Sequence, residues 1–389
     1  MKKGKRIVSL ALSLVMAVGV LVTGNLPEKV QAASTYYEKE SNNNRNEANK
    51  IKVNQKVIGN VDESGDEDWY VFTLPADGVF TIDMEQVTNA SSMCEVDMYD
   101  ASLNWQTGCD ASTSFHSKRF NYGKEKTFYI RINHSYYSDG DYTFTINFKE
   151  TKGKWEIEDN NSKNRANKLS GKMKGTILGS NDEDWFKYTA PANGYVDFKF
   201  INEDGVVTNY GWDFTVYDKN LTELASWNTT TDDVFGTFTV SKKTVLYIKL
   251  SGWSMTDNLY SITPVFKATD YVEKEDNNSF KKATKIQANK SYVGVRNYEG
   301  DEDYYKFVAP ANGTYKVSFT VEAEVSNGYD VVLYGPTKKE IKTLSDLTDD
   351  SSAKIKMKKG KTYYIHVNRH STYSYTWLAK YKVKVTKVK

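Results

Sequence analysis

The stretch Glu38-Lys-Glu-Ser-Asn-Asn43 determines how the rest of the chain is interpreted, because it occurs three times. Its copies are Glu156-Ile-Glu-Asp-Asn-Asn161 and Glu273-Lys-Glu-Asp-Asn-Asn278. Each copy is followed by an acidic knot before an aromatic residue, in the forms Asp66-Glu-Asp68-Trp69, Asp182-Glu-Asp184-Trp185 and Asp301-Glu-Asp303-Tyr304. Two separated acidic motifs that recur together indicate a repeated unit with one shared site.

Other landmarks keep the same spacing within each unit. A glycine lies seven residues before the first Asp of each knot, and a proline lies seven residues after the second: Gly59, Gly175, Gly294, Pro75, Pro191 and Pro310. We therefore predict a repeat in each of the segments 34–150, 151–268 and 269–389, with short joints at 149–154 and 267–270.

The segments between these landmarks read as strands. Tyr195-Val-Asp-Phe-Lys-Phe200 alternates apolar and polar residues, and Pro191-Ala-Asn-Gly194 is a turn signal. Seven or eight such strands in each unit predict an all-β protein of three tandem, jelly-roll-like antiparallel β-sandwich domains. Helix is expected only as a turn near 44–50 and at the equivalent positions of the other two units. We also expect each unit to close with a hairpin, pairing 128–132 with 142–146 and likewise in the other copies.

The first 32 residues have the pattern of a secretory signal peptide. Basic residues from Lys2 to Arg6 precede an apolar run over 7–22, and Val30-Gln31-Ala32 fits a cleavage site. Removing this segment takes away five Lys and Arg and one Glu, so the formal charge changes from +2 to −2. The near-neutral mature chain is expected to be secreted, without a membrane span, and to bind neither nucleic acid nor anionic membrane.

The two cysteines, Cys94 and Cys109, both fall in the first repeat. After secretion they could form a disulfide across a hairpin-like segment. Closing a loop of about 15 residues would contribute roughly 3 kcal/mol. The alternative is two unpaired thiols on neighbouring strands.

The acidic motifs supply the oxygen ligands that Ca²⁺ prefers, six to eight to an ion. Like charges gathered without a cation would repel one another. The alternative is a set of solvated turn residues. The second copy is the least well matched, because 28 residues separate Glu156 from Asp184, against 30 in the others. The predicted ligands are Glu38, Glu40, Asn42, Asn43, the carbonyl of Asn60, Asp66, Asp68, Glu156, Glu158, Asn160, Asn161, Asp182, Asp184, Glu273, Glu275, Asn277, Asn278, Asp301 and Asp303.

These motifs resemble the bacterial pre-peptidase C-terminal domain family, which includes the collagen-binding domains of clostridial collagenases. The resemblance covers nearly all of 35–389 and is carried by Glu-x-Glu-x-Asn-Asn, the glycine, the acidic knot and the Pro-x-x-Gly turn. It implies a jelly-roll sandwich whose acidic N-terminal segment is tied to the barrel by calcium. Such modules usually accompany secreted peptidases, whereas we expect no catalytic domain among residues 34–389.

Exposed aromatic residues at the tips of the expected closing hairpins are candidates for contacting a flat or fibrous ligand. They could equally pack on a neighbouring module. In the collagen-binding relatives two tyrosines follow the Tyr-Ile step, but the three corresponding pairs retain one aromatic residue, Trp253. The candidates are Tyr136, Tyr137, Trp253, His370, Tyr373 and Tyr375.

Catalytic motifs are not found, since the four histidines show neither HExxH nor metal spacing and no GxSxG occurs. The leading hypothesis is a secreted, non-catalytic, calcium-dependent adhesion protein that binds an extracellular polymer, such as collagen-like matrix or cell wall. The alternatives are a chaperone-like or inhibitory partner of a secreted peptidase, and an enzyme of unrecognised type.

Overall fold

The computed structural model describes residues 34–61, 65–86, 94–111, 114–134, 140–179, 181–205, 211–229, 233–252, 257–296, 301–322, 328–370 and 380–388. This part of the chain is all-β, as predicted. Its helical content is two 3-10 turns, η1 (Arg45–Glu47) and η2 (Lys163–Arg165). Both turns follow an acidic segment, at the places where the sequence indicates a turn. No helix in the described ranges is long and apolar enough to cross a membrane.

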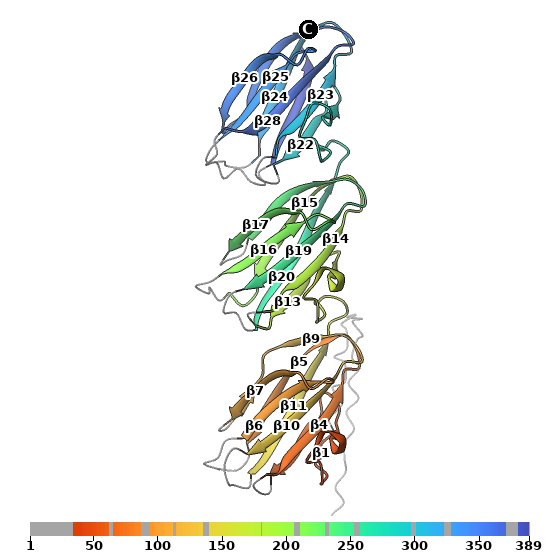
Figure 1. Cartoon of the computed structure of the whole chain (residues 1–389), viewed down its shortest axis with the longest axis vertical. Helices are drawn as coiled ribbons and strands as arrows, with labels where there is room; N and C mark the ends of the chain where they lie inside the picture. The colour runs from red at the N-terminus through yellow and green to blue at the C-terminus, as the bar shows by residue number, and fades with distance from the viewer. Residues whose placement is uncertain are drawn as a thin grey trace, which may run out of the picture.

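Six sheets form three consecutive pairs along the long axis of the molecule (Figure 1). In the first pair, one sheet contains β1 (Tyr36–Tyr37), β3 (Lys56–Val61), β11 (Gly140–Glu150), β5 (Gly78–Gln86), β8 (Ser114–His116) and β9 (Phe120–Tyr122). The other contains β2 (Asn49–Lys50), β4 (Glu67–Thr73), β10 (Thr127–His134), β6 (Cys94–Asp100) and β7 (Trp105–Ala111). We call this pair the first sandwich.

The second sandwich repeats this arrangement. One sheet contains β12 (Asn167–Leu169), β14 (Asp184–Thr189), β19 (Val245–Gly252), β16 (Trp212–Tyr217) and β17 (Glu223–Thr229). The other contains β13 (Met173–Ile177), β20 (Asn258–Ala268), β15 (Gly194–Asn202) and β18 (Asp233–Val240).

The third sandwich has the same strand order. One sheet contains β21 (Thr284–Ile286), β23 (Asp303–Val308), β28 (Thr362–Arg369), β25 (Tyr329–Tyr334) and β26 (Glu340–Leu347). The other contains β22 (Ser291–Val295), β29 (Lys380–Lys387), β24 (Gly313–Val321) and β27 (Ser351–Met357). Most pairings are antiparallel, and short parallel pairs such as β1 with β3 lie at sheet edges.

The predicted closing hairpins are wrong. β10 pairs with β4 and β6, whereas β11 pairs with β3 and β5 in the opposite sheet. The corresponding strands β19 and β20, and β28 and β29, are divided between sheets in the same way. Both strands of each couple have one apolar face, and placing them in opposite sheets lets both faces meet in one core.

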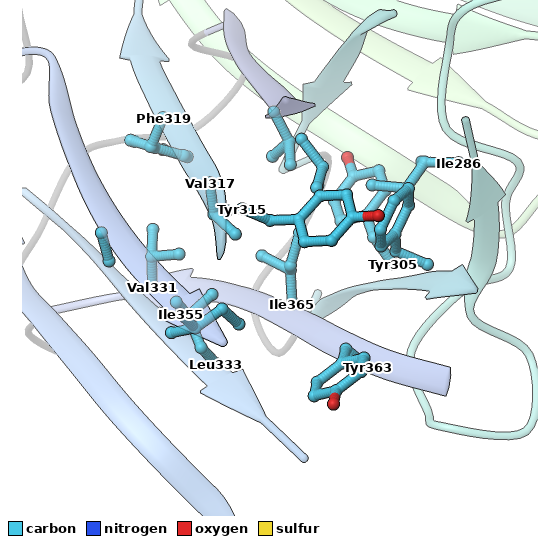
Figure 2. Close-up of a cluster of buried hydrophobic side chains, with 14 of the residues drawn as sticks. Ile286, Tyr305, Tyr315, Val317, Phe319, Val331, Leu333, Ile355, Tyr363 and Ile365 are labelled. Atoms are coloured by element: carbon cyan, nitrogen blue, oxygen red, sulfur yellow. The ribbon is translucent and has the colours of Figure 1, made fainter. Parts of the chain in front are cut away.

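One hydrophobic core fills each sandwich. In the third, Tyr315, Val317 and Phe319 of β24 lie against Val331 and Leu333 of the facing sheet (Figure 2). Residues on these strands alternate between buried and exposed, because successive side chains point to opposite faces of a sheet. The alternation in the sequence therefore identified the inward faces correctly.

Contacts between sandwiches accompany both joints. At the first, Arg119 donates to Asp257 Oδ1 at 2.8 Å and to Asp204 Oδ2 at 2.9 Å, and Lys118 donates to the carbonyl of Leu178 at 2.7 Å. At the second, Tyr195 packs with Val272 and Val293.

Cys94 and Cys109 lie on paired strands β6 and β7, opposite Ala111 and Val96 respectively. Their side chains lie outside the described part of the structure, so the disulfide stays a prediction. Five of the candidate ligand-contacting aromatics (Tyr136, Tyr137, Trp253, Tyr373 and Tyr375) and the predicted signal peptide also lie outside the described residues.

Candidate metal centre

Each acidic segment crosses from one sheet of its sandwich to the other. In the first, the N–H of Glu38 donates to the carbonyl of Ile58 on β3, and the N–H of Trp69 on β4 donates to the carbonyl of Asn42. The second segment bonds in the same way to Lys174 and Trp185, and the third to Val293 and Tyr304. A cis peptide bond follows the second glutamate in all three. The repeated sequence therefore adopts a repeated backbone path.

Three carboxylates converge beneath each of these crossings. They are both glutamates of the segment and the second aspartate of the knot: Glu38, Glu40 and Asp68; Glu156, Glu158 and Asp184; Glu273, Glu275 and Asp303. In each set, one oxygen from every residue lies within 4.8 Å of the other two. Oxygens at this separation can share one cation whose ligands lie 2.3–2.6 Å away.

Tyrosine hydroxyls hold two of the three carboxylates in place. Tyr142 donates to Asp68 Oδ2 at 2.7 Å, and Tyr70 donates to Glu38 Oε1 at 2.7 Å. In the second sandwich Tyr260 alone contacts Glu156 and Asp184, at 2.8 and 2.6 Å, because Phe186 replaces the other tyrosine. Tyr305 and Tyr381 hold Glu273 and Asp303 in the third.

The recurring glycine explains how the tyrosines fit. A Cβ added at Gly59 would overlap the hydroxyls of Tyr142 and Tyr70. Gly175 and Gly294 lie against the corresponding tyrosines in the same way. The glycine marks a close approach between a strand and the site. From the sequence these tyrosines read only as strand residues, although Tyr142, Tyr260 and Tyr381 recur at one position of the last strand in each unit.

The first asparagine of each segment is also part of the site. Asn42, Asn160 and Asn277 are fully buried, and the first two donate to the first glutamate of their segment. Several oxygens here are buried without a hydrogen-bond donor: Asn42 Oδ1, Asp68 Oδ1, Glu158 Oε1, Asn160 Oδ1 and Asp184 Oδ1. A cation would satisfy such oxygens, so the donor set fits a hard ion such as Ca²⁺.

Without a bound cation, the fully ionised carboxylate clusters are electrostatically unfavourable. Burial raises the pKa of the Asp68 carboxyl to about 9, and neighbouring Glu38 adds to the rise. Burial raises the pKa of Glu156 to about 7 and lifts that of Asp184 well above its ordinary value. Three close carboxylates cannot all ionise cheaply without a positive partner.

Other predicted ligands lie outside these groups of three. The first aspartates of the knots, Asp66, Asp182 and Asp301, are buried nearby. The second asparagines, Asn43, Asn161 and Asn278, are exposed or half-buried. The Asn60 side chain donates to Asp141 at 2.6 Å, and its N–H donates to Glu38 Oε2 at 2.8 Å.

Among the side chains that the structure describes, no histidine belongs to these three groups. His370 is exposed beside Asp330, with 2.9 Å between His370 Nδ1 and Asp330 Oδ1. His366 is buried on the outer face of β28 and stacks on Tyr304 with 4.1 Å between ring centroids.

Comparisons with known proteins give a weak relationship to a collagenase. No family model matches the chain. Over 166 residues the chain is 28% identical to collagenase ColT of Clostridium tetani, an alignment that covers 39% of this chain and 16% of the collagenase. The match thus spans about a sixth of that relative's length. It supports weak homology to the group that the acidic motifs resemble.

Superpositions on solved structures are poor. The pre-peptidase C-terminal domain of a collagenase from Bacillus anthracis aligns with 26% of this chain and 93% of its own, at 19% identity and a TM-score of 0.23. Tandem CBM51 modules of a Streptococcus pneumoniae glycoside hydrolase align with 54% of this chain and 81% of their own, at 10% identity and a TM-score of 0.18.

Proposed function

We propose that this chain is a secreted, non-catalytic binding protein whose three sandwiches each take up one Ca²⁺. The proposal of calcium binding is based on the three converging carboxylates in each sandwich. Around Asp68 and Asp184, several of the buried oxygens also receive no hydrogen bond. The same arrangement of two glutamates and an aspartate occurs in all three sandwiches, which argues against chance accumulation of acidic turn residues.

Calcium would be held by the two glutamates, the second aspartate and the first asparagine of each site. A bound divalent cation supplies positive charge that converts repulsion among the carboxylates into attraction. The glutamates belong to the crossing segment and the aspartate to a sheet strand. The tyrosines orient both, so the chain's own contribution is to fix the crossing segment where an ion can join it to the sheet.

We further propose an extracellular polymer as the target. Three similar units in one chain favour a repetitive ligand, because engaging one unit raises the effective concentration of the others. The match to part of a collagenase supports a binding module of the kind that accompanies secreted peptidases. A peptidase-partner role is the competing hypothesis.

A pull-down separates these proposals. Mature protein is mixed with insoluble collagen, chitin and peptidoglycan in 5 mM calcium (roughly extracellular) or chelator. Calcium-dependent retention on one polymer is the expected result. Retention on none, together with co-purification of a peptidase, would replace the polymer proposal with the peptidase-partner hypothesis. Calorimetry on the same samples tests calcium binding separately.

A further inference from the structure

Formal charge changes steadily along the chain although the total is near neutral. Residues 34–150 contain 11 Lys and Arg against 19 Asp and Glu, residues 151–268 contain 14 against 15, and residues 269–389 contain 22 against 15. The formal charges are therefore −8, −1 and +7. Uptake of one Ca²⁺ by each sandwich would make the third more positive still. The near-zero net charge of the whole chain therefore hides a strongly basic C-terminal third.

Much of this charge lies on one face of the third sandwich. In the sheet ordered β22-β29-β24-β27, the apolar residues of β24, β27 and β29 point into the core. Every outward residue between them is Lys, Ser or Thr: Thr314, Lys316, Ser318, Thr320, Ser352, Lys354, Lys356, Lys380, Lys382, Lys384 and Thr386. We call this surface the lysine face.

Four lysines of this face have no acidic partner in the described part of the chain. Lys380 lies 3.5 Å from Asp197 of the second sandwich, and Lys382 pairs with Glu322. Among the described residues, no ion pair involves the remaining four, Lys316, Lys354, Lys356 and Lys384, all of which are exposed.

The positions of these lysines are costly for the fold. Lys316 lies directly opposite Lys354 in the register of β24 and β27, and like charges opposite each other destabilise a sheet. Lysines often protect an edge strand such as β27. Lys316 and Lys384 lie instead on the two inner strands, where edge protection is not needed.

The other sandwiches do not carry lysines at these positions. Counting from the first glycine of the strand, Lys316 corresponds to Thr81 in β5 and Asp197 in β15, and Thr320 corresponds to Glu85. The basic character therefore belongs to the third sandwich and does not follow from the repeated fold.

We propose that the lysine face binds a linear anionic polysaccharide. This inference rests on the function proposed above, binding to an extracellular polymer. Evenly spaced lysines, about 7 Å apart along a strand, would contact successive acidic groups of an extended chain. The interspersed hydroxyls can bond to sugar hydroxyls. Within β24, β27 and β29 the face presents no outward aromatic for stacking bases and no outward apolar side chain for entering a lipid layer.

The test measures binding of the mature full-length chain to heparin, used as a sulfated probe polysaccharide, at about 150 mM salt. The protein should be retained on immobilised heparin. This retention should fall steeply with added salt, because salt ions compete for the charged groups. Replacing Lys316, Lys354, Lys356 and Lys384 with Gln should weaken binding at least tenfold. The matched control replaces Lys281, Lys285, Lys339 and Lys342, exposed lysines outside the lysine face, and should change affinity less than twofold.

Folding is checked by the melting temperature, which the first variant should not lower, and by a Lys→Arg version of the same four positions, which should retain binding. Equal losses in test and control variants would overturn the proposal. Tighter binding to duplex DNA or phosphatidylglycerol vesicles than to heparin would also overturn it. Retention on collagen or chitin without retention on heparin would overturn this inference alone, whereas retention on no polymer would overturn the proposed function as well.

Discussion

The first and second acidic clusters contain the same residue types but lie in different surroundings. Glu38 is half-buried and Glu40 exposed, whereas Glu156 and Glu158 are 1% and 5% exposed. The second cluster is covered because the preceding sandwich reaches it. The N–H of Glu158 donates to the carbonyl of Asn121 on β9 at 2.9 Å, in the sandwich before its own.

The third cluster is intermediate between these two. Glu273 accepts a hydrogen bond from Thr239 of the second sandwich at 3.0 Å, but Glu275 remains exposed. Burial of a site therefore depends on what precedes it in the chain. If each site takes up calcium as proposed, the same ligand set should have three affinities and three ion-exchange rates, and the second site should be the most strongly affected by metal removal.

The largest expected effect is that of calcium itself. An ion that binds only the folded state at 5 mM, with a dissociation constant of about 10⁻⁴ M, stabilises each site by roughly 2 kcal/mol. We expect the melting temperature to rise by several degrees between chelator and calcium. Differential scanning calorimetry checks this. Identical melting curves in both conditions would contradict calcium binding at all three sites.

Substituting the aspartate of each cluster should show how the different burial of the first and second clusters affects stability. In chelator at pH 8, Asp184→Asn should stabilise the protein by about 1–3 kcal/mol, because it removes a buried carboxylate with incomplete pairing. Asp68→Asn should stabilise it less. Both carboxyls have a folded-state pKa raised above the unfolded value, so their contribution to stability is present at low pH and lost as pH rises.

The benefit of both substitutions should accordingly fade toward pH 4, where the carboxyls are protonated. In calcium each variant should instead be destabilised. Equal effects of the two substitutions in chelator would show that burial does not distinguish the sites.

Removing the neighbouring sandwich should weaken the second site selectively. We propose that 34–150, 151–268 and 269–389 each fold alone, with β-rich circular dichroism. The fragment 151–268 should bind calcium several-fold more weakly than 34–268, because it lacks the Asn121 contact to Glu158. Titration calorimetry measures both. Unchanged affinity would mean that the first sandwich covers the site without supporting it.

The smallest effect concerns the outer face of β28. His366 lies opposite Tyr304, a position occupied by Arg131 in the first sandwich and Lys249 in the second. Burial lowers the pKa of His366 against the opposing influence of Glu302, with Arg296 also nearby. A lowered histidine pKa contributes stability at neutral pH that is lost as pH falls.

We therefore expect wild-type protein to lose up to about 1 kcal/mol relative to His366→Gln between pH 7 and pH 5. Thermal melts across this range measure the difference. His370→Gln is the control of opposite sign, because Asp330 raises the pKa of exposed His370. A pH-independent difference for His366→Gln would contradict the expectation.

Periodicity predicted the inward faces of the strands because burial depends on alternation, which a sequence displays directly. It failed for the closing strands, because two successive amphipathic strands can pair with each other or enter opposite sheets with the same pattern. Tyr142 and Phe144 face the core in either case. The choice depends on packing between segments far apart in the chain.

The site was predictable in part for a similar reason. Glu38, Glu40 and Asp68 could be predicted to lie together because the two acidic motifs recur as a pair in all three units. Tyr142 and Tyr70 were not, because tyrosine is common in strands. The different exposure of Glu40 and Glu158 depends on a neighbouring sandwich, and no local sequence feature reports that contact.

The in-line arrangement of the sandwiches has a mechanical consequence (Figure 1). A polymer-bound protein pulled from its two ends would transmit the load through the joints in series. At the first joint the load reaches Glu158 and Arg119, whose bonds connect neighbouring sandwiches. The second site lies beside this joint. An ion bound there would cross-link the acidic segment to the sheet at a point that bears the force.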